Sequence, residues 1–100
     1  MYGTVARIRA RAGTEQQLRE FQDRWWRERA PAITGARQTI IYRTDKDPNE
    51  YVLIVVFSDR KAYEANARDS EQDRWYRDLL TLLEGESEWT DGEIVSYFQA

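Results

Sequence analysis

The stretch YVLIVVF, from Tyr51 to Phe57, decides the fold because it is apolar at every position. Side chains of a strand alternate between two faces, so both faces of this strand favour burial. Helices of the same chain can cover one alternating set of residues but not the other. The two sets are Leu53, Val55 and Phe57 on one face and Val52, Ile54 and Val56 on the other. The sequence therefore predicts a sheet that needs a second cover opposite its own helices.

Three further strands are predicted around this run. Residues Tyr2 to Arg11 alternate between two faces, which is the period of a strand. Ala36 to Thr44 is rich in β-branched and aromatic residues, and the turn residues Asp45 to Asn49 join it to the apolar run as an antiparallel hairpin. Trp89 to Gln99 predicts a last strand, with Asp91-Gly92 as a turn or bulge within it.

Helical patterns fill the two longer gaps between strands. Thr14 to Gln17 predicts a capping box, and the helix that it begins should end before Ala30-Pro31. Its apolar stripe consists of Leu18, Phe21 and Trp25. Ser58 or Asp59 can cap the next helix, which bends or restarts at a second capping box, Ser70 to Asp73. The later stripe consists of Trp75, Leu79, Leu82 and Leu83, and Gly85 ends the helix.

The order strand-helix-strand-strand-helix-strand is the split βαβ arrangement. It predicts an α+β, ferredoxin-like fold: a four-stranded antiparallel sheet with helices on one face, within a single domain of residues 1–100. A second copy, packed sheet against sheet about a two-fold axis, is the expected cover for the other face. The alternative is a monomer with an exposed apolar patch, which proteins in water seldom tolerate when it is large.

Composition excludes several classes of function. The net charge of −3 argues against nucleic acid as a partner, because phosphate binding needs a concentrated basic face. The chain has no cysteine and no histidine, which excludes disulfides, Cys/His metal sites and imidazole catalysis. No signal-peptide pattern and no apolar run of membrane-spanning length is present, so we expect a cytoplasmic protein without membrane contact.

Four features carry a resemblance to a known family. They are Gly13-Thr14-Glu15 after the first strand, Gly35 before the second, Phe57 to Tyr63 after the third, and Trp75-Tyr76 with Leu79-Leu80. Over nearly its whole length the chain resembles the antibiotic biosynthesis monooxygenase type of dimeric α+β barrel protein. The resemblance implies a cofactor-free monooxygenase acting on a quinol, an anthrone or a similar small aromatic. Neither a cofactor nor a metal is expected, and the haem-degrading members use a histidine that this chain lacks.

The resemblance also implies a pocket between the helices and the sheet. Anthrone-oxidising members have an asparagine on the third strand, a tryptophan at its end and a tyrosine on the next helix. The corresponding residues here are Leu53, Phe57 and Tyr63, so only the tyrosine is kept. Asn66 stands where many members have a histidine. Tyr63 and Asn66 are the candidate catalytic residues, and the predicted pocket lining is Leu53, Phe57, Trp26 and Trp75.

Each candidate has a structural alternative. The Tyr63 hydroxyl can relay a proton, with Asn66 one helical turn away to orient the substrate, or the tyrosine can simply pack its ring in the core. Arg7, Arg9 and Arg11 can attract an anionic substrate, but pairing with acidic side chains on a neighbouring strand or subunit is the favoured interpretation. The alternative to a monooxygenase is a non-catalytic homodimer that binds a small molecule, and an isomerase or decarboxylase is a third possibility.

Overall fold

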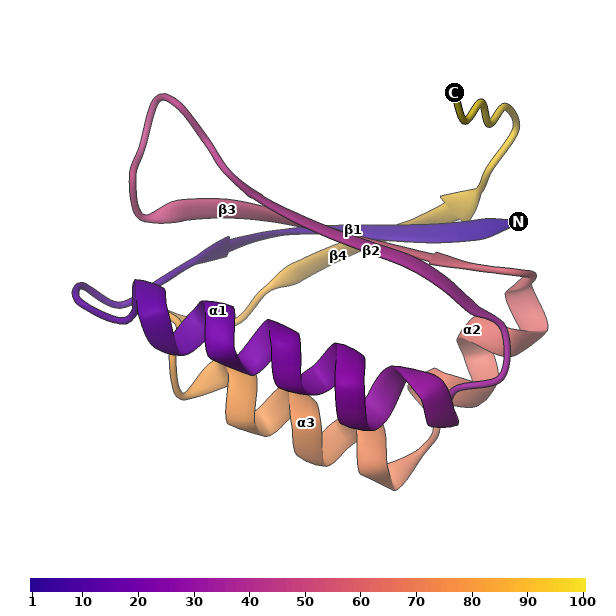
Figure 1. The fold of residues 1–100 in the computed structure, drawn as a ribbon, viewed down its shortest axis with the longest axis horizontal. Helices are drawn as coiled ribbons and strands as arrows, with labels where there is room; N and C mark the ends of the chain where they lie inside the picture. The colour runs from indigo at the N-terminus through magenta and orange to yellow at the C-terminus, as the bar shows by residue number, and fades with distance from the viewer.

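The computed structural model describes residues 1–100 and contains a four-stranded antiparallel sheet with strand order β2-β3-β1-β4. The strands are β1 (Tyr2–Arg9), β2 (Ala36–Arg43), β3 (Glu50–Phe57) and β4 (Glu88–Glu93). The helices are α1 (Glu15–Arg24), α2 (Arg60–Ala67) and α3 (Ser70–Leu80). All three helices lie on one face of the sheet (Figure 1). The predicted α+β, ferredoxin-like fold is confirmed.

Strand register decides which residues of β3 meet the helices. Thr4, Ala6 and Ile8 of β1 are buried, and they lie opposite Val55, Leu53 and Tyr51 of β3. The helices therefore cover the set that includes Leu53, Val55 and Phe57. Leu18 and Phe21 of α1, and Trp25 directly after it, reach the same layer and are all buried. This packing follows from the two periods, two residues in a strand and about 3.6 in a helix.

The opposite sheet face has no helix over it, as Figure 1 shows. We call it the open face. Val52 and Val56 are buried there, but Ile40 and Tyr42 of β2 are 42% and 49% exposed. Val5 of β1, on the other side of β3 from Ile40, is also exposed. The exposed apolar side chains of the open face thus belong to β1 and β2, whereas Val52 and Val56 of the unbroken run are already buried within the single chain.

Two predicted helix caps were wrong, although α1 and α3 begin within one residue of the predicted positions. The Thr14 hydroxyl donates to the carbonyl oxygens of Arg11 and Leu82 instead of accepting from the helix, so no capping box forms. Asp69, not Ser70, caps α3 by accepting from the Glu71 amide at 2.9 Å. Side-chain caps depend on the backbone angles of one residue, and neighbouring capping residues compete for the position. Asp59 caps α2, as one of the two predicted alternatives.

The last strand is shorter than predicted and has no bulge. It ends at Glu93, and Asp91 and Gly92 continue the ladder opposite Thr4 and Gly3. Residues 94–100 leave the sheet on the side away from the helices (Figure 1). A regular ladder aims the Asp91 side chain at the same face as Thr4, which is the helix face. This register is what brings Asp91 to the candidate site.

Two backbone features hold the helical layer on the sheet. The chain after α1 continues as a π-helical turn, Trp25–Arg29, and a 3-10 turn, Ala30–Ala32. Gly35 then adopts a φ of +87°, and its carbonyl oxygen accepts from the Ser58 amide at 2.7 Å, just before α2. A glycine suits this conformation because it has no Cβ.

No helix combines the length and apolar character that crossing a membrane requires.

Candidate active site

A cavity of about 300 Å³ lies between the helices and the sheet. We call it the main cavity. It contains both candidate catalytic residues, Tyr63 and Asn66, together with Phe57 at the end of β3. The other lining residues are Thr4, Trp25, Val55, Ala67, Gln72, Asp73, Tyr76 and Trp89. Its walls are mostly apolar, with a few polar groups among them, which is the usual composition of a small-molecule site.

Tyr63 takes part in a hydrogen-bonded group that joins three elements. Its hydroxyl, on α2, donates to Asp91 Oδ2 of β4 at 2.8 Å. Thr4 of β1 donates its hydroxyl to the other carboxylate oxygen of Asp91 at 2.6 Å. Thr4 and Asp91 are direct cross-strand partners, and Thr4 is buried. The carboxylate is therefore held from two sides, by two residues that both line the main cavity.

The environment of Tyr63 keeps its hydroxyl protonated at neutral pH. Burial, and then the hydrogen bond to Asp91, raise the pKa of Tyr63 from 10.0 to about 12. Burial disfavours the charged phenolate, and a neighbouring carboxylate disfavours it further. Because the O–H points at Asp91, the lone pairs of the tyrosine oxygen remain able to accept a hydrogen bond from a bound molecule.

This arrangement predicts a pH-dependent loss of stability at alkaline pH. The folded pKa of Tyr63 is raised, so its stabilising contribution is complete below the unfolded pKa of 10.0 and is lost as pH rises to about 12. The Tyr63 hydroxyl should therefore titrate late in the ultraviolet absorbance of tyrosinate. Tyr63→Phe should remove that late component. Asp91→Asn should move it toward lower pH, and an unchanged titration in both variants would contradict the assignment.

Arg29 fixes the other polar wall of the main cavity. It is the last residue of the π-helical turn and is only 5% exposed. Its Nη2 donates to Asn66 Oδ1 at 2.8 Å and to Asp69 at 3.1 Å, and its Nε donates to Gln72 Oε1 at 3.4 Å. The carbonyl oxygen of Asn66 is thus occupied. The amide NH₂ group of Asn66 remains available as a donor to a ligand.

A second, smaller cavity of about 50 Å³ adjoins the main cavity, and we call it the side cavity. Five residues line both, namely Trp25, Val55, Gln72, Tyr76 and Trp89. The structure places Leu53 and Trp75 in the side cavity, beside Thr39, while Phe57 lies in the main cavity. Trp26 lines neither, because it is half exposed and stacks on the outer side of Trp25.

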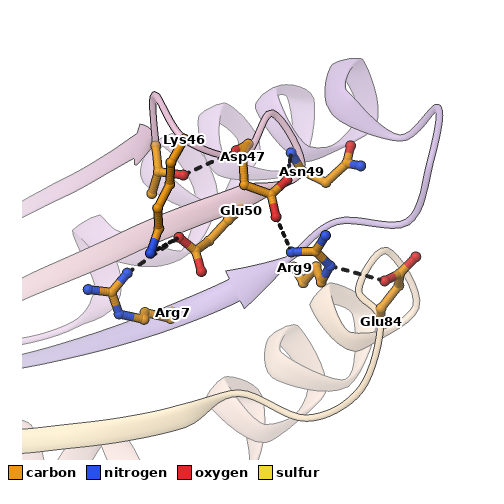
Figure 2. A network of polar contacts seen from close by, with 8 residues as sticks. Arg7, Arg9, Lys46, Asp47, Asn49, Glu50 and Glu84 are labelled. Atoms are coloured by element: carbon orange, nitrogen blue, oxygen red, sulfur yellow. Dashed lines mark hydrogen bonds and ion pairs between the residues drawn. The ribbon is translucent and has the colours of Figure 1, made fainter.

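Arg7 and Arg9 line neither cavity, and Figure 2 shows them in a network with acidic side chains. Arg7 pairs with Glu50 at 3.4 Å, and Arg9 pairs with Asp47 and with Glu84. These pairs are solvent-exposed, and such pairs contribute little to stability. The favoured interpretation, that these arginines pair with acidic neighbours, is confirmed for Arg7 and Arg9. Arg11 is exposed and lines neither cavity.

Sequence reasoning missed Asp91, Thr4 and Arg29. Asp91 was interpreted as part of a turn with Gly92, and Thr4 as an ordinary member of an alternating strand. One signal was available: Thr4 is the polar residue in a row that continues with Ala6, Ile8 and Ala10. A buried hydroxyl in such a row needs a hydrogen-bonding partner. The sequence did not indicate which residue that partner would be.

The fold and the cavities define a class of protein: a ferredoxin-like α+β protein with a small-molecule cavity between its helices and its sheet. The particular family follows from the sequence. The family model for antibiotic biosynthesis monooxygenase matches residues 1–77, and the chain belongs to this family. Among curated proteins, no sequence matches this chain significantly. Asp91 lies outside residues 1–77, so the family match does not include the residue that bonds to Tyr63.

Solved structures share the fold of this chain. Rv0793 from Mycobacterium tuberculosis is 18% identical with a TM-score of 0.77, and the match covers 98% of each chain. The NE2512 protein of unknown function from Nitrosomonas europaea is 17% identical with a TM-score of 0.78, covering 99% of this chain and 93% of that one. An antibiotic biosynthesis monooxygenase is 13% identical with a TM-score of 0.73, covering 96% and 100%. At these identities the likeness shows the shared fold.

Proposed function

We propose that this protein is a cofactor-independent monooxygenase that oxidises a quinol, an anthrone or a similar small aromatic in the main cavity. The observation that carries the proposal is the Tyr63 hydroxyl, bonded to Asp91 at 2.8 Å on the wall of a largely apolar cavity. Membership of the antibiotic biosynthesis monooxygenase family supports the oxygenase chemistry. Tyr63 and Asn66 are the proposed catalytic residues.

The proposed chemistry starts with loss of a proton from the substrate hydroxyl, which a quinol carries directly and an anthrone carries in its enol form. That hydroxyl donates to the Tyr63 oxygen while Tyr63 passes its own proton toward Asp91, so the phenol acts as a neutral relay. The substrate anion gives one electron to dioxygen, and the resulting radical pair forms a carbon–oxygen bond. In an anthrone a CH₂ group becomes a carbonyl and the second oxygen atom leaves as water, so substrate and dioxygen account for all electrons.

The remaining wall residues orient the substrate and keep water out. The Asn66 amide donates to a substrate carbonyl or to the developing oxyanion, since Arg29 already occupies its own carbonyl oxygen. Phe57, Trp25 and Trp89 supply flat apolar surface for an aromatic ring. An apolar surrounding strengthens each of these polar contacts, because water does not compete for them.

Oxygen uptake with a panel of hydroquinones and anthrones tests the proposal. We expect Tyr63→Phe and Asp91→Asn each to lower kcat by about 100-fold, the usual contribution of a positioned proton-transfer group. Tyr97→Phe is the matched control, because this half-exposed tyrosine lies beyond the sheet, and it should leave kcat unchanged. Oxygen uptake that is no faster with the protein than without it would disprove the monooxygenase proposal.

A non-catalytic binding protein is the second candidate. Leu53 and Phe57 stand where the anthrone-oxidising members have an asparagine and a tryptophan, and this observation favours binding without turnover. Native mass spectrometry for a carried ligand, together with thermal shifts by the same aromatic panel, distinguishes the two candidates. If Tyr63→Phe loses stability but no activity, the hydroxyl has a structural role.

We also propose that a second copy covers the open face, each copy contributing residues 1–100 as one domain. The exposed side chains of Ile40, Tyr42 and Val5 support this, since they adjoin Ile54 in one apolar surface. Two copies related by a two-fold axis would bury this surface against itself. Val55 and Phe57 of β3 line the main cavity on the other face of the sheet. In such a dimer the two sheets would therefore pack together, and the main cavity of each copy would lie on the outer side of its own sheet.

Light scattering at about micromolar concentration should give the mass of a dimer, the range in which stable homodimers persist. Ile40→Asp should give a monomer with an unchanged circular dichroism spectrum, because a charge at a buried interface is strongly unfavourable. Gln17→Asp, on the exposed side of α1, is the control and should stay dimeric. A wild-type monomer, or a dimeric Ile40→Asp variant, would contradict the proposed interface.

A further inference from the structure

Thr39 presents a buried hydroxyl that has no hydrogen-bonding partner in the protein. It lies on β2 opposite Val55 of β3, so it shares the face of the sheet that the helices cover. Its side chain lines the side cavity. Burying a hydroxyl without a partner is unfavourable, and nearly all buried polar groups in proteins are paired. The unpaired Thr39 hydroxyl therefore needs an explanation.

The surroundings of Thr39 favour a group attached to an apolar body. Eight of the eleven residues that line the side cavity are hydrophobic, among them Leu53, Trp75 and Leu79. The carbonyl oxygen of Gln72 is already bonded to Arg29. A buried water normally has two to four polar partners, and these walls offer few. A substituent that brings its own carbon atoms would use the apolar walls and the hydroxyl together.

Size limits what can enter. A volume of about 50 Å³ is too small for an aromatic ring but accommodates a hydroxyl, a carbonyl or a short polar side group. The side cavity and the main cavity share five lining residues, so a molecule held in the main cavity can extend directly into it. The ring would then lie near Tyr63 and its substituent near Thr39.

We propose that the side cavity is a subsite for a hydrogen-bonding substituent, a hydroxyl or a carbonyl, on an aromatic ligand whose ring occupies the main cavity. Thr39 is the residue that selects for this substituent. The inference rests on the proposed function for placing an aromatic ring in the main cavity. A site built around a hydrogen bond rejects the analogue that lacks the bonding group, because the protein's own hydroxyl is then left unpaired.

Isothermal titration calorimetry under anaerobic conditions tests the subsite without any turnover. The probes are the two naphthols, with one hydroxyl, and a panel of isomeric dihydroxynaphthalenes, with two. We expect the wild-type protein to bind at least one diol about tenfold more tightly than either naphthol, the size of effect that one neutral hydrogen bond gives. No such preference, including no binding of any diol, would overturn the proposal.

Two variants assign the preference to the Thr39 hydroxyl. Thr39→Val keeps the size and the β-branched shape that suit a strand, and it should bind naphthol and diol equally. Thr39→Ser keeps the hydroxyl and should retain the preference. If Thr39→Val is more stable than the wild type but shows the same tenfold preference, the hydroxyl contacts no ligand and the subsite is disproved.

The two proposals fail in distinguishable ways. Selective diol binding that depends on Thr39, with no oxygen uptake on any substrate, would retain the subsite and disprove the monooxygenase. Oxygen uptake that depends on Tyr63, with a diol preference that Thr39→Val does not change, would retain the monooxygenase and disprove the subsite.

Discussion

Gly35→Ala is expected to lower the free energy of unfolding by about 3 kcal/mol, the sum of a strained backbone and a steric clash. Gly35 has a φ of +87°, and a Cβ there would stand 2.5 Å from Ser58 Oγ and 2.6 Å from Ala62 Cβ. The serine side chain can rotate away, but the alanine methyl is fixed to α2. Chemical denaturation followed by tryptophan fluorescence measures the loss.

Gly85→Ala is the matched control for this prediction. Gly85 has nearly the same φ, +85°, but a Cβ added there would have no neighbouring atom within 4 Å. Only the cost of the left-handed backbone conformation remains, so the free energy of unfolding should fall by about 1 kcal/mol. Equal losses in the two variants would show that the contact between Gly35 and α2 is unimportant. A larger loss at Gly35 would mean that α2, which carries Tyr63, is held in place by this close approach.

Arg29→Ala is the second substitution with a large expected effect, a loss of about 3 kcal/mol of unfolding free energy. The side chain is almost fully buried and donates to Asn66, Asp69 and Gln72, which belong to α2, α3 and the link between them. Its removal leaves the acceptors on Asn66 and Gln72 without their donor and opens a space beneath them. Thermal and chemical denaturation should both report the loss.

Arg77→Ala provides the comparison for Arg29. Arg77 pairs with Asp73 at 2.9 Å, but its side chain is 77% exposed, so the loss should be no more than about 0.5 kcal/mol. Arg29→Met separates packing from hydrogen bonding, because methionine fills much of the volume without donating. If Arg29→Ala costs no more than Arg77→Ala, the buried network does not stabilise the junction of α2 and α3.

The strands and their faces could be predicted because they depend on local periodicity. The alternation from Tyr2 to Arg11 and the apolar run from Tyr51 to Phe57 each indicate a face without reference to distant residues. The stripe of α1 was predicted for the same reason. Element ends were less predictable. Thr14 bonds to Leu82, 68 positions away, and no local pattern contains that contact.

The candidate site was only partly predictable. Tyr63 and Asn66 were selected through resemblance to a family, whereas the residues that give them chemical character are distant in sequence. Asp91 reaches Tyr63 through the β1–β4 register, and Arg29 reaches Asn66 through packing of the turn after α1 on α2. Arginine and aspartate are common on surfaces, so their types alone did not distinguish these two from solvated neighbours.

The pairing of β1 with β4 also has a consequence for the order in which the molecule assembles. Thr4 and Asp91 are separated by 87 positions, while the hairpin of β2 and β3 closes a short turn. Strand pairings between residues far apart in sequence have a larger loop-closure entropy cost and form slowly. During synthesis on the ribosome, Tyr63 would emerge and its helix could form well before its carboxylate partner exists. The hydrogen bond between Tyr63 and Asp91 is thus among the last contacts to form, and the proposed proton relay would be complete only after β4 pairs with β1.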